Sequence, residues 1–158
     1  DDPFDPYESM AHKLGIRDRI ELVKSDFDSL PGHLARGDVA LNPRVECDGL
    51  PQKLLNYMAA RKPIVSFVSS GKDVTDGITG LVVEDGDTNA FALAVDQLLE
   101  DRTMARRMGE NAGAFVRAEL SWEHTARRTE AVYRQLLEPA ATASRGGDAL
   151  ASCPGGAS

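Results

Sequence analysis

The sequence predicts an α/β fold, a Rossmann-like parallel sheet with flanking helices. Short apolar segments alternate with helical segments of about ten residues, and several of these apolar segments are continuous, which is typical of parallel strands buried on both faces. The chain has 158 residues, of which 42% are hydrophobic, so it can build one core but not two full-sized domains. We expect strands at 20–24, 39–43, 63–68 and 80–84.

Helices are expected between these strands, at 7–14, 28–35 and 51–60, and three more helices follow the last strand. Ser29 and Ser121 are expected to cap two helices, and the acidic segment 84–87 to form a turn with a helix cap. Each of the last three helices carries an apolar stripe at helical spacing, and we expect all three stripes in the core. The stripes are Phe91, Ala94, Val95, Leu98 and Leu99; Met104, Met108, Ala112 and Phe115; and Trp122, Ala126, Val132 and Leu136.

The composition argues against several classes of partner. The 18 basic and 25 acidic residues give a formal net charge of −7, which disfavours nucleic acid or anionic lipid as the main partner. Cys47 and Cys153 lack metal-ligand spacing and are expected as free thiols in a reducing compartment. No apolar run approaches the roughly 20 residues that span a bilayer, so no transmembrane segment is expected. These observations predict a cytoplasmic protein.

The two ends of the chain lead to separate expectations. The first residue is an aspartate rather than a methionine, and a helical pattern begins almost at once, so we expect upstream sequence to be missing. From 138 to 158 the chain consists mainly of Ala, Gly, Ser and Pro without periodicity, which predicts a disordered tail. One domain over 1–137 is therefore expected.

The best candidate for a binding site is the short helix between the second and third expected strands, because a turn leads directly into it. Pro51 suits the first helical turn, and the free amides of Gln52 and Lys53 would then point toward a phosphate. Asn56 lies roughly 7 Å further along the axis, about one sugar ring away. Asp48, before the helix, offers a carboxylate to the hydroxyls of a sugar.

Each of these residues also has a simpler interpretation. Lys53 and Asn56 would serve equally to solvate an exposed helix face. Asp48 and Gly49 form a dipeptide that is common in turns. The three histidines lie in separate segments, none of them beside a plausible nucleophile, and the acidic turn lacks the spaced ligands of a calcium loop. No metal and no cofactor are therefore expected.

Five segments carry a resemblance through their order and spacing, although each is weak by itself. They are 14–20 (LGIRDRI), 35–40 (ARGDVA), 48–63 (DGLPQKLLNYMAARKP), 77–87 (GITGLVVEDGD) and 120–123 (LSWE). With them, the chain resembles the C-terminal donor-binding domain of GT-B type, retaining family-four glycosyltransferases. The resemblance implies a transferase domain that binds a nucleotide-diphosphate sugar, such as a UDP- or GDP-sugar.

The resemblance also assigns roles to residues. In that family two glutamates flank the start of this helix; the first contacts the donor sugar and the second the ribose of the nucleotide. The matching positions are Asp48, a shorter carboxylate, and Asn56, which loses the charge and cannot accept both ribose hydroxyls bidentately. The backbone implied to approach the distal phosphate and sugar is that of Gly49, Leu50, Pro51 and Gln52. The base pocket is implied at Lys24, Ser25 and Asp26.

The same resemblance indicates what this chain would lack. The acceptor-binding N-terminal domain, and the Arg and Lys that neutralise the diphosphate, precede the matching segment, so the chain alone is expected to be inactive. No metal is implied, because those cations and helix amides stabilise the leaving diphosphate. Two alternatives stay open. One is a non-catalytic Rossmann-like nucleotide-binding or interaction module, and the other is a GT-B type sugar epimerase, whose acid and base residues we do not find in the sequence.

Overall fold

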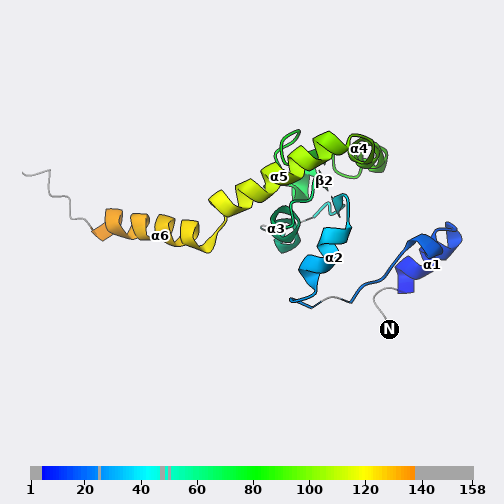
Figure 1. The fold of residues 1–158 in the computed structure, drawn as a ribbon, viewed down its shortest axis with the longest axis horizontal. Helices are drawn as coiled ribbons and strands as arrows, with labels where there is room; N and C mark the ends of the chain where they lie inside the picture. The colour runs from blue at the N-terminus through cyan, green and yellow to red at the C-terminus, as the bar shows by residue number, and fades with distance from the viewer. Residues whose placement is uncertain (1–4, 25, 47–48, 50, 138–158) are drawn as a thin grey trace, which may run out of the picture. The chain divides into compact units, whose positions relative to one another are not determined.

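A computed structural model of the chain describes residues 5–24, 26–46, 49 and 51–137 (Figure 1). The elements are α1 (Asp5–Lys13), η1 (Arg17–Arg19), α2 (Leu30–Arg36), β1 (Ala40–Asn42), α3 (Gln52–Ala59), β2 (Ile64–Phe67), η2 (Val68–Ser70), β3 (Gly80–Val83), α4 (Thr88–Glu100), α5 (Arg102–Glu119) and α6 (Trp122–Leu137). The chain divides into two compact units after Gly113. The predicted tail at 138–158 and both cysteines lie outside the described residues, so the domain boundary expected at 137 stays a prediction.

The first unit contains a parallel sheet, which confirms the predicted fold class. Its strands lie in the order β1-β2-β3, and both neighbouring pairs are parallel. Ala40 aligns with Ile64, and Ile64 aligns with Gly80. The predictions of strands at 39–43, 63–68 and 80–84 are thereby confirmed. Because all three strands run the same way, their carboxyl-terminal ends lie at one edge of the sheet and their amino-terminal ends at the other.

One face of the sheet is covered by α4. All four residues of β2 are buried, and Val65 and Phe67 belong to the main apolar cluster together with Phe91 and Leu98 of α4. The rings of Phe67 and Phe91 lie 5.0 Å apart at 54°, within the range of favourable aromatic pairs. The cluster also includes Met108 of α5. In the stripe predicted on α4, Phe91, Ala94 and Leu98 are therefore buried and belong to the same apolar cluster as β2, whereas Leu99 is exposed.

Helix α3 supplies a second set of buried side chains. Leu54 and Met58 are fully buried but do not belong to the cluster beneath α4. Side chains alternate between the faces of a strand, so Ile64 and Ser66 point away from the face that carries Val65. These observations place α3 on the face of the sheet opposite α4, as expected for parallel strands connected by a helix.

The segment 20–24 forms no strand, so that prediction is wrong. Within the described part of the chain no strand pairs with it, and Leu22 and Val23 are nearly half exposed. A strand needs a neighbour to satisfy its backbone N–H and C=O groups, and an apolar segment by itself does not supply one. Glu21 instead forms an exposed ion pair with Arg36 of α2, at 2.9 Å.

The stripe predicted on α6 is also not buried. Trp122 is 89% exposed, and Val132 and Leu136 are exposed as well. Helix α6 nevertheless begins where predicted, because the hydroxyl of Ser121 accepts a hydrogen bond from the backbone N–H of His124, at 3.1 Å. The period of the stripe therefore predicted the helix correctly, but the expected burial of the stripe is wrong.

Candidate functional site

The candidate site is the start of α3, which lies at the carboxyl-terminal edge of the sheet because α3 follows β1. Pro51 precedes the first helical residue, with φ −65° and ψ 112°, one position earlier than its predicted place inside the first turn. The N–H of Leu54 donates to the carbonyl of Pro51. Among the described residues no acceptor is found for the backbone N–H of Gln52 or of Lys53. N–H groups at the positive end of a helix dipole suit an anion, and the role predicted for these two stays a prediction.

The side chains of α3 divide into an exposed polar side and a buried apolar side. Asn56 is exposed and Lys53 half-buried, while Leu54 and Met58 are fully buried. Tyr57, next to Asn56, is half-buried, and burial raises the pKa of its phenol above the ordinary value. The ring is therefore neutral at physiological pH, and Lys53 supplies the positive charge of this face.

The turn before α3 contains the residues predicted to contact the sugar and the distal phosphate. Asp48 and Leu50 lie outside the described residues, so their predicted contacts with a sugar and a phosphate stay predictions. Gly49 has φ +79°, in the left-handed region that glycine adopts without strain, and no atom of the described residues lies within 4 Å of a Cβ placed there. The backbone conformation, rather than lack of space, therefore favours glycine at this position.

A buried polar cluster lies at the same edge, and sequence reasoning missed it. The side-chain amide of Asn42 donates to the hydroxyls of Ser66 and Ser70, both at 2.9 Å, and these three side chains are fully buried. The other polar side-chain atom, Asn42 Oδ1, is buried and has no hydrogen-bond partner within the part of the chain that the structure describes. The only signal in the sequence was a polar residue at the end of an apolar strand. The cluster ties the ends of β1 and β2 together just where the chain leaves toward α3.

The acidic turn at 84–87 forms a second part of this edge. Asp87 accepts a hydrogen bond from the N–H of Ala90, at 2.9 Å, so the predicted turn with a helix cap is confirmed. Asp85 accepts from both the backbone N–H and the hydroxyl of Ser69, and these hydrogen bonds hold the pKa of its carboxyl below the ordinary value. The turn after β3 is thereby joined to the segment after β2.

The predicted base pocket lies in the turn before α2. Ser25 is outside the described residues, and Lys24 is exposed. Asp26 accepts hydrogen bonds from the N–H and the hydroxyl of Ser29, at 2.8 and 2.5 Å, which lower the pKa of Asp26. Ser29 is the N-cap residue of α2, as predicted, but its side chain makes no capping hydrogen bond. The role of these residues toward a base stays a prediction.

The chain is similar to known proteins over most of its length. The family model described as "Glycosyl transferases group 1" matches residues 1–101. An alpha-D-kanosaminyltransferase of Streptomyces kanamyceticus is 30% identical over 133 residues, which is 82% of this chain and 34% of that protein. A GDP-mannose-dependent alpha-(1-6)-phosphatidylinositol monomannoside mannosyltransferase of Mycobacterium tuberculosis is 32% identical over 123 residues, or 72% of this chain and 32% of that protein. The chain thus spans about a third of the length of these relatives.

Solved structures show the same fold. Sucrose-phosphate synthase from Thermosynechococcus elongatus matches with a TM-score of 0.74 and 28% identity, over 82% of this chain and 33% of that one. HepE of Anabaena, solved with UDP, matches with a TM-score of 0.71 and 18% identity, over 85% of this chain and 37% of that one. None of the described helices is long and apolar enough to cross a bilayer.

Proposed function

The chain belongs to the group 1 glycosyl transferases, and on that premise we propose that it is the donor-binding part of an enzyme that transfers a sugar, with retention, from a nucleotide-diphosphate sugar. The acceptor is bound elsewhere. The observation that carries this proposal is the start of α3, where the N–H groups of Gln52 and Lys53 have no acceptor among the described residues. An oriented pair of N–H groups at a helix start is a suitable partner for a phosphate.

The transition state of the reaction is where these groups act. As the bond between sugar and diphosphate breaks, negative charge builds on the diphosphate, and fixed donors stabilise it more than they stabilise the substrate. The amides of Gln52 and Lys53, with the ammonium of Lys53, serve this role in the proposal. Asn56 donates or accepts one hydrogen bond at the ribose, and Asp48 holds the hydroxyls of the transferred sugar.

Further support comes from relatives that use such donors. The name of the mycobacterial relative states dependence on GDP-mannose, and HepE of Anabaena was solved with UDP-glucose. Both nucleotide sugars join a sugar to a nucleoside through a diphosphate, which is the group that the start of α3 suits. We therefore propose that the donor of this chain is a UDP- or GDP-sugar. The enzyme would act in the cytoplasm.

A partner domain upstream is the second part of the proposal. The chain spans about a third of its relatives, and α6 leaves an apolar face uncovered, with Trp122, Tyr133 and Leu137 each more than half exposed. An apolar face of this kind on a monomer marks a contact surface. In the proposal, an upstream domain binds the acceptor and supplies the cations that neutralise the diphosphate. The present chain is inactive without that domain.

The binding step is tested by NMR titration with UDP and GDP. In a longer protein that includes the upstream part, we expect the amide signals of Gly49 and of 52–56 to shift, and Lys53→Gln to weaken binding about tenfold. Arg107→Gln, an exposed change of equal charge on α5, is the matched control. Uridine, which lacks the phosphates, should shift these signals far less. No shift at millimolar nucleotide would contradict the site.

The alternative is a non-catalytic nucleotide-binding or interaction module, and Asn56 is the residue that favours it. An amide at the position where the family carries a glutamate weakens the ribose contact. Transfer assays with the longer protein separate the two functions. Turnover of a nucleotide sugar supports the transferase, whereas nucleotide binding without turnover by wild type and by Asn56→Glu supports the module.

A further inference from the structure

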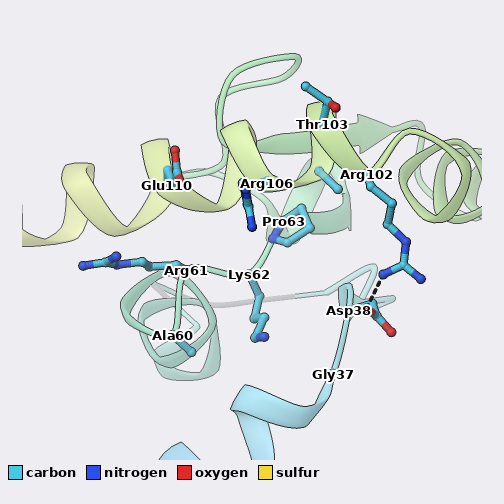
Figure 2. A pocket seen from close by; sticks show the side chains of 11 residues that line it. Gly37, Asp38, Ala60, Arg61, Lys62, Pro63, Arg102, Thr103, Arg106 and Glu110 are labelled. Carbon is cyan, nitrogen blue, oxygen red and sulfur yellow. Dashed lines mark hydrogen bonds and ion pairs between the residues drawn. The ribbon is translucent and has the colours of Figure 1, made fainter.

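A cavity of about 720 Å³ lies at the amino-terminal edge of the sheet, away from the start of α3 (Figure 2). Its walls come from the turn before β1, the turn between α3 and β2, and the first turns of α5. Helix α3 has eight residues, so its two ends lie about 12 Å apart along the axis. The cavity and the proposed donor site therefore lie at opposite ends of the same helix.

The cavity is more basic than the rest of the chain. Its basic residues outnumber its acidic ones by four to two, in a chain with a formal net charge of −7. The basic residues are Arg61, Lys62, Arg102 and Arg106, and the acidic residues are Asp38 and Glu110. A local excess of positive charge in an acidic protein raises the concentration of small anions at that place.

Two of these cations already have partners. Arg102 Nη1 lies 2.5 Å from Asp38 Oδ1, and Lys62 Nζ donates to the carbonyl of Ala35 at 2.9 Å. For the side chains of Arg61 and Arg106, no hydrogen-bond or ion-pair partner is found among the described residues, and Glu110 is not paired with either of them. Each guanidinium therefore presents its full fork of N–H donors.

The backbone of Arg61 ends α3 and shapes one wall of the cavity. Its φ is +54°, and it is the only residue other than glycine with positive φ in the described part of the chain. The N–H groups of Arg61 and Lys62 donate to the carbonyls of Met58 and Tyr57, which is the hydrogen-bond pattern that ends a helix at a left-handed residue. Gly109 of α5 packs against the same turn so closely that a Cβ there would lie 2.1 Å from the carbonyl oxygen of Arg61. The turn and α5 are thus held together at the cavity wall.

We propose that this cavity binds a small molecule that carries a phosphate group, with the guanidinium of Arg106 as its direct ligand and the other cations of the wall adding positive charge around it. A guanidinium pairs with phosphate through two parallel N–H donors. The volume exceeds that of inorganic phosphate and suits a phosphate ester, since pockets for small organic ligands range from about 300 to 1,000 Å³. A concave site on an acidic chain favours such an ester over nucleic acid or a lipid surface.

Inorganic phosphate is the first probe, titrated into the 158-residue chain and followed by the amide signals in NMR. We expect shifts at 61–62 and 102–110 that sodium chloride at equal ionic strength does not produce. Equal shifts with chloride, or phosphate shifts confined to 49–56, would overturn the proposal. A nucleotide that fails to shift 49–56 would count against the proposed donor site and leave this cavity untouched.

Two neighbouring arginines provide the matched variants. Arg106 lines the cavity and Arg107 does not, although both are exposed on α5 and the change to glutamine removes one charge from each. We expect Arg106→Gln to weaken phosphate binding about tenfold and Arg107→Gln to leave it within about twofold. Equal weakening by both variants would show that only the overall charge matters.

Changes at Arg61 and Glu110 test the direction of the effect. Arg61→Gly relieves the left-handed φ and removes one cation from the cavity wall, so it should raise the thermal midpoint in the absence of phosphate and weaken phosphate binding by less than Arg106→Gln does. An unchanged phosphate affinity in this variant would assign Arg61 a structural role only. Glu110→Gln removes a carboxylate from the cavity wall and should strengthen phosphate binding. Weaker binding in Glu110→Gln would contradict the proposed arrangement.

Discussion

The helices α4 and α6 carry the same kind of apolar stripe, yet only α4 has its stripe buried. Leu98 of α4 is 1% exposed, whereas Leu136 of α6 is 76% exposed. Both helices begin at a polar residue whose side chain accepts a hydrogen bond from the third helical N–H. The difference therefore comes from the environment and not from the helices themselves. An apolar stripe predicts which face of a helix avoids water, but it does not predict which element covers that face.

The largest effect that separates the two helices is expected from the same substitution in each. Leu98→Ala should lower the free energy of unfolding by about 2–5 kcal/mol, because it leaves a cavity in a packed cluster. Leu136→Ala should change it by less than about 0.5 kcal/mol in this chain, because the side chain is exposed. Urea denaturation followed by circular dichroism measures both. Similar losses would show that the stripe of α6 is covered in solution.

A second contrast concerns how closely α5 packs against the turn at Arg61. Gly109→Ala would place a Cβ against the backbone carbonyl of Arg61, so we expect a loss of about 1–3 kcal/mol. Gly32→Ala in α2 meets no atom within 4 Å, and it should instead stabilise by about 0.5–1 kcal/mol because alanine favours the helix. Thermal unfolding of both variants is the measurement. A tolerated Gly109→Ala would mean that the turn at Arg61 is free to move.

The two helix caps allow a finer comparison. Asp87→Ala removes the cap of α4 and should lower the free energy of unfolding by about 1 kcal/mol, since α4 is part of the core. Ser121→Ala removes the cap of α6 and should speed amide exchange in the first turn of that helix without changing global unfolding. Hydrogen exchange read by NMR distinguishes the two results. A global loss from Ser121→Ala would show that α6 folds together with the core.

The smallest expected effect lies in the turn before α4. The hydrogen bonds from Ser69 hold the pKa of Asp85 below its ordinary value of 3.8, so the folded state favours the ionised carboxylate. The resulting stability is fully present above the unfolded pKa and is lost as pH falls through the folded value. NMR titration of the Asp85 carboxyl should give a pKa below 3.8 that returns toward this value in Ser69→Ala. An unshifted titration would contradict the contact.

Local patterns predicted the elements that need only their own residues and a common core. The apolar run of β2 and the caps at Asp87 and Ser121 follow from nearest neighbours in sequence, and all three were confirmed. The segment 20–24 and the stripe of α6 failed for one shared reason. Each needs a partner surface to become a buried strand or a buried face, and a local pattern carries no information about that partner.

The position of the candidate site followed from a local signal, a proline before a helical pattern, and α3 does begin directly after Pro51. The binding roles predicted for Gln52 and Lys53 stay predictions. Asn42 and Arg61 were not identified, because what distinguishes them depends on the tertiary structure. Asn42 matters through a buried acceptor without a partner. Arg61 matters through a left-handed φ, for which an arginine gives no sequence signal as glycine or asparagine would.

The buried amide of Asn42 bears on how β1 and β2 find their alignment during folding. In the ladder Asn42 lies opposite Ser66, the residue whose hydroxyl accepts its hydrogen bond. A slip by one residue would set this amide beside Val65 or Phe67. Its N–H donors would then be buried without an acceptor, which costs about 1–3 kcal/mol. Misregistered sheets are thereby penalised once the strands are buried, and a single polar side chain favours the pairing on which the position of the binding edge depends.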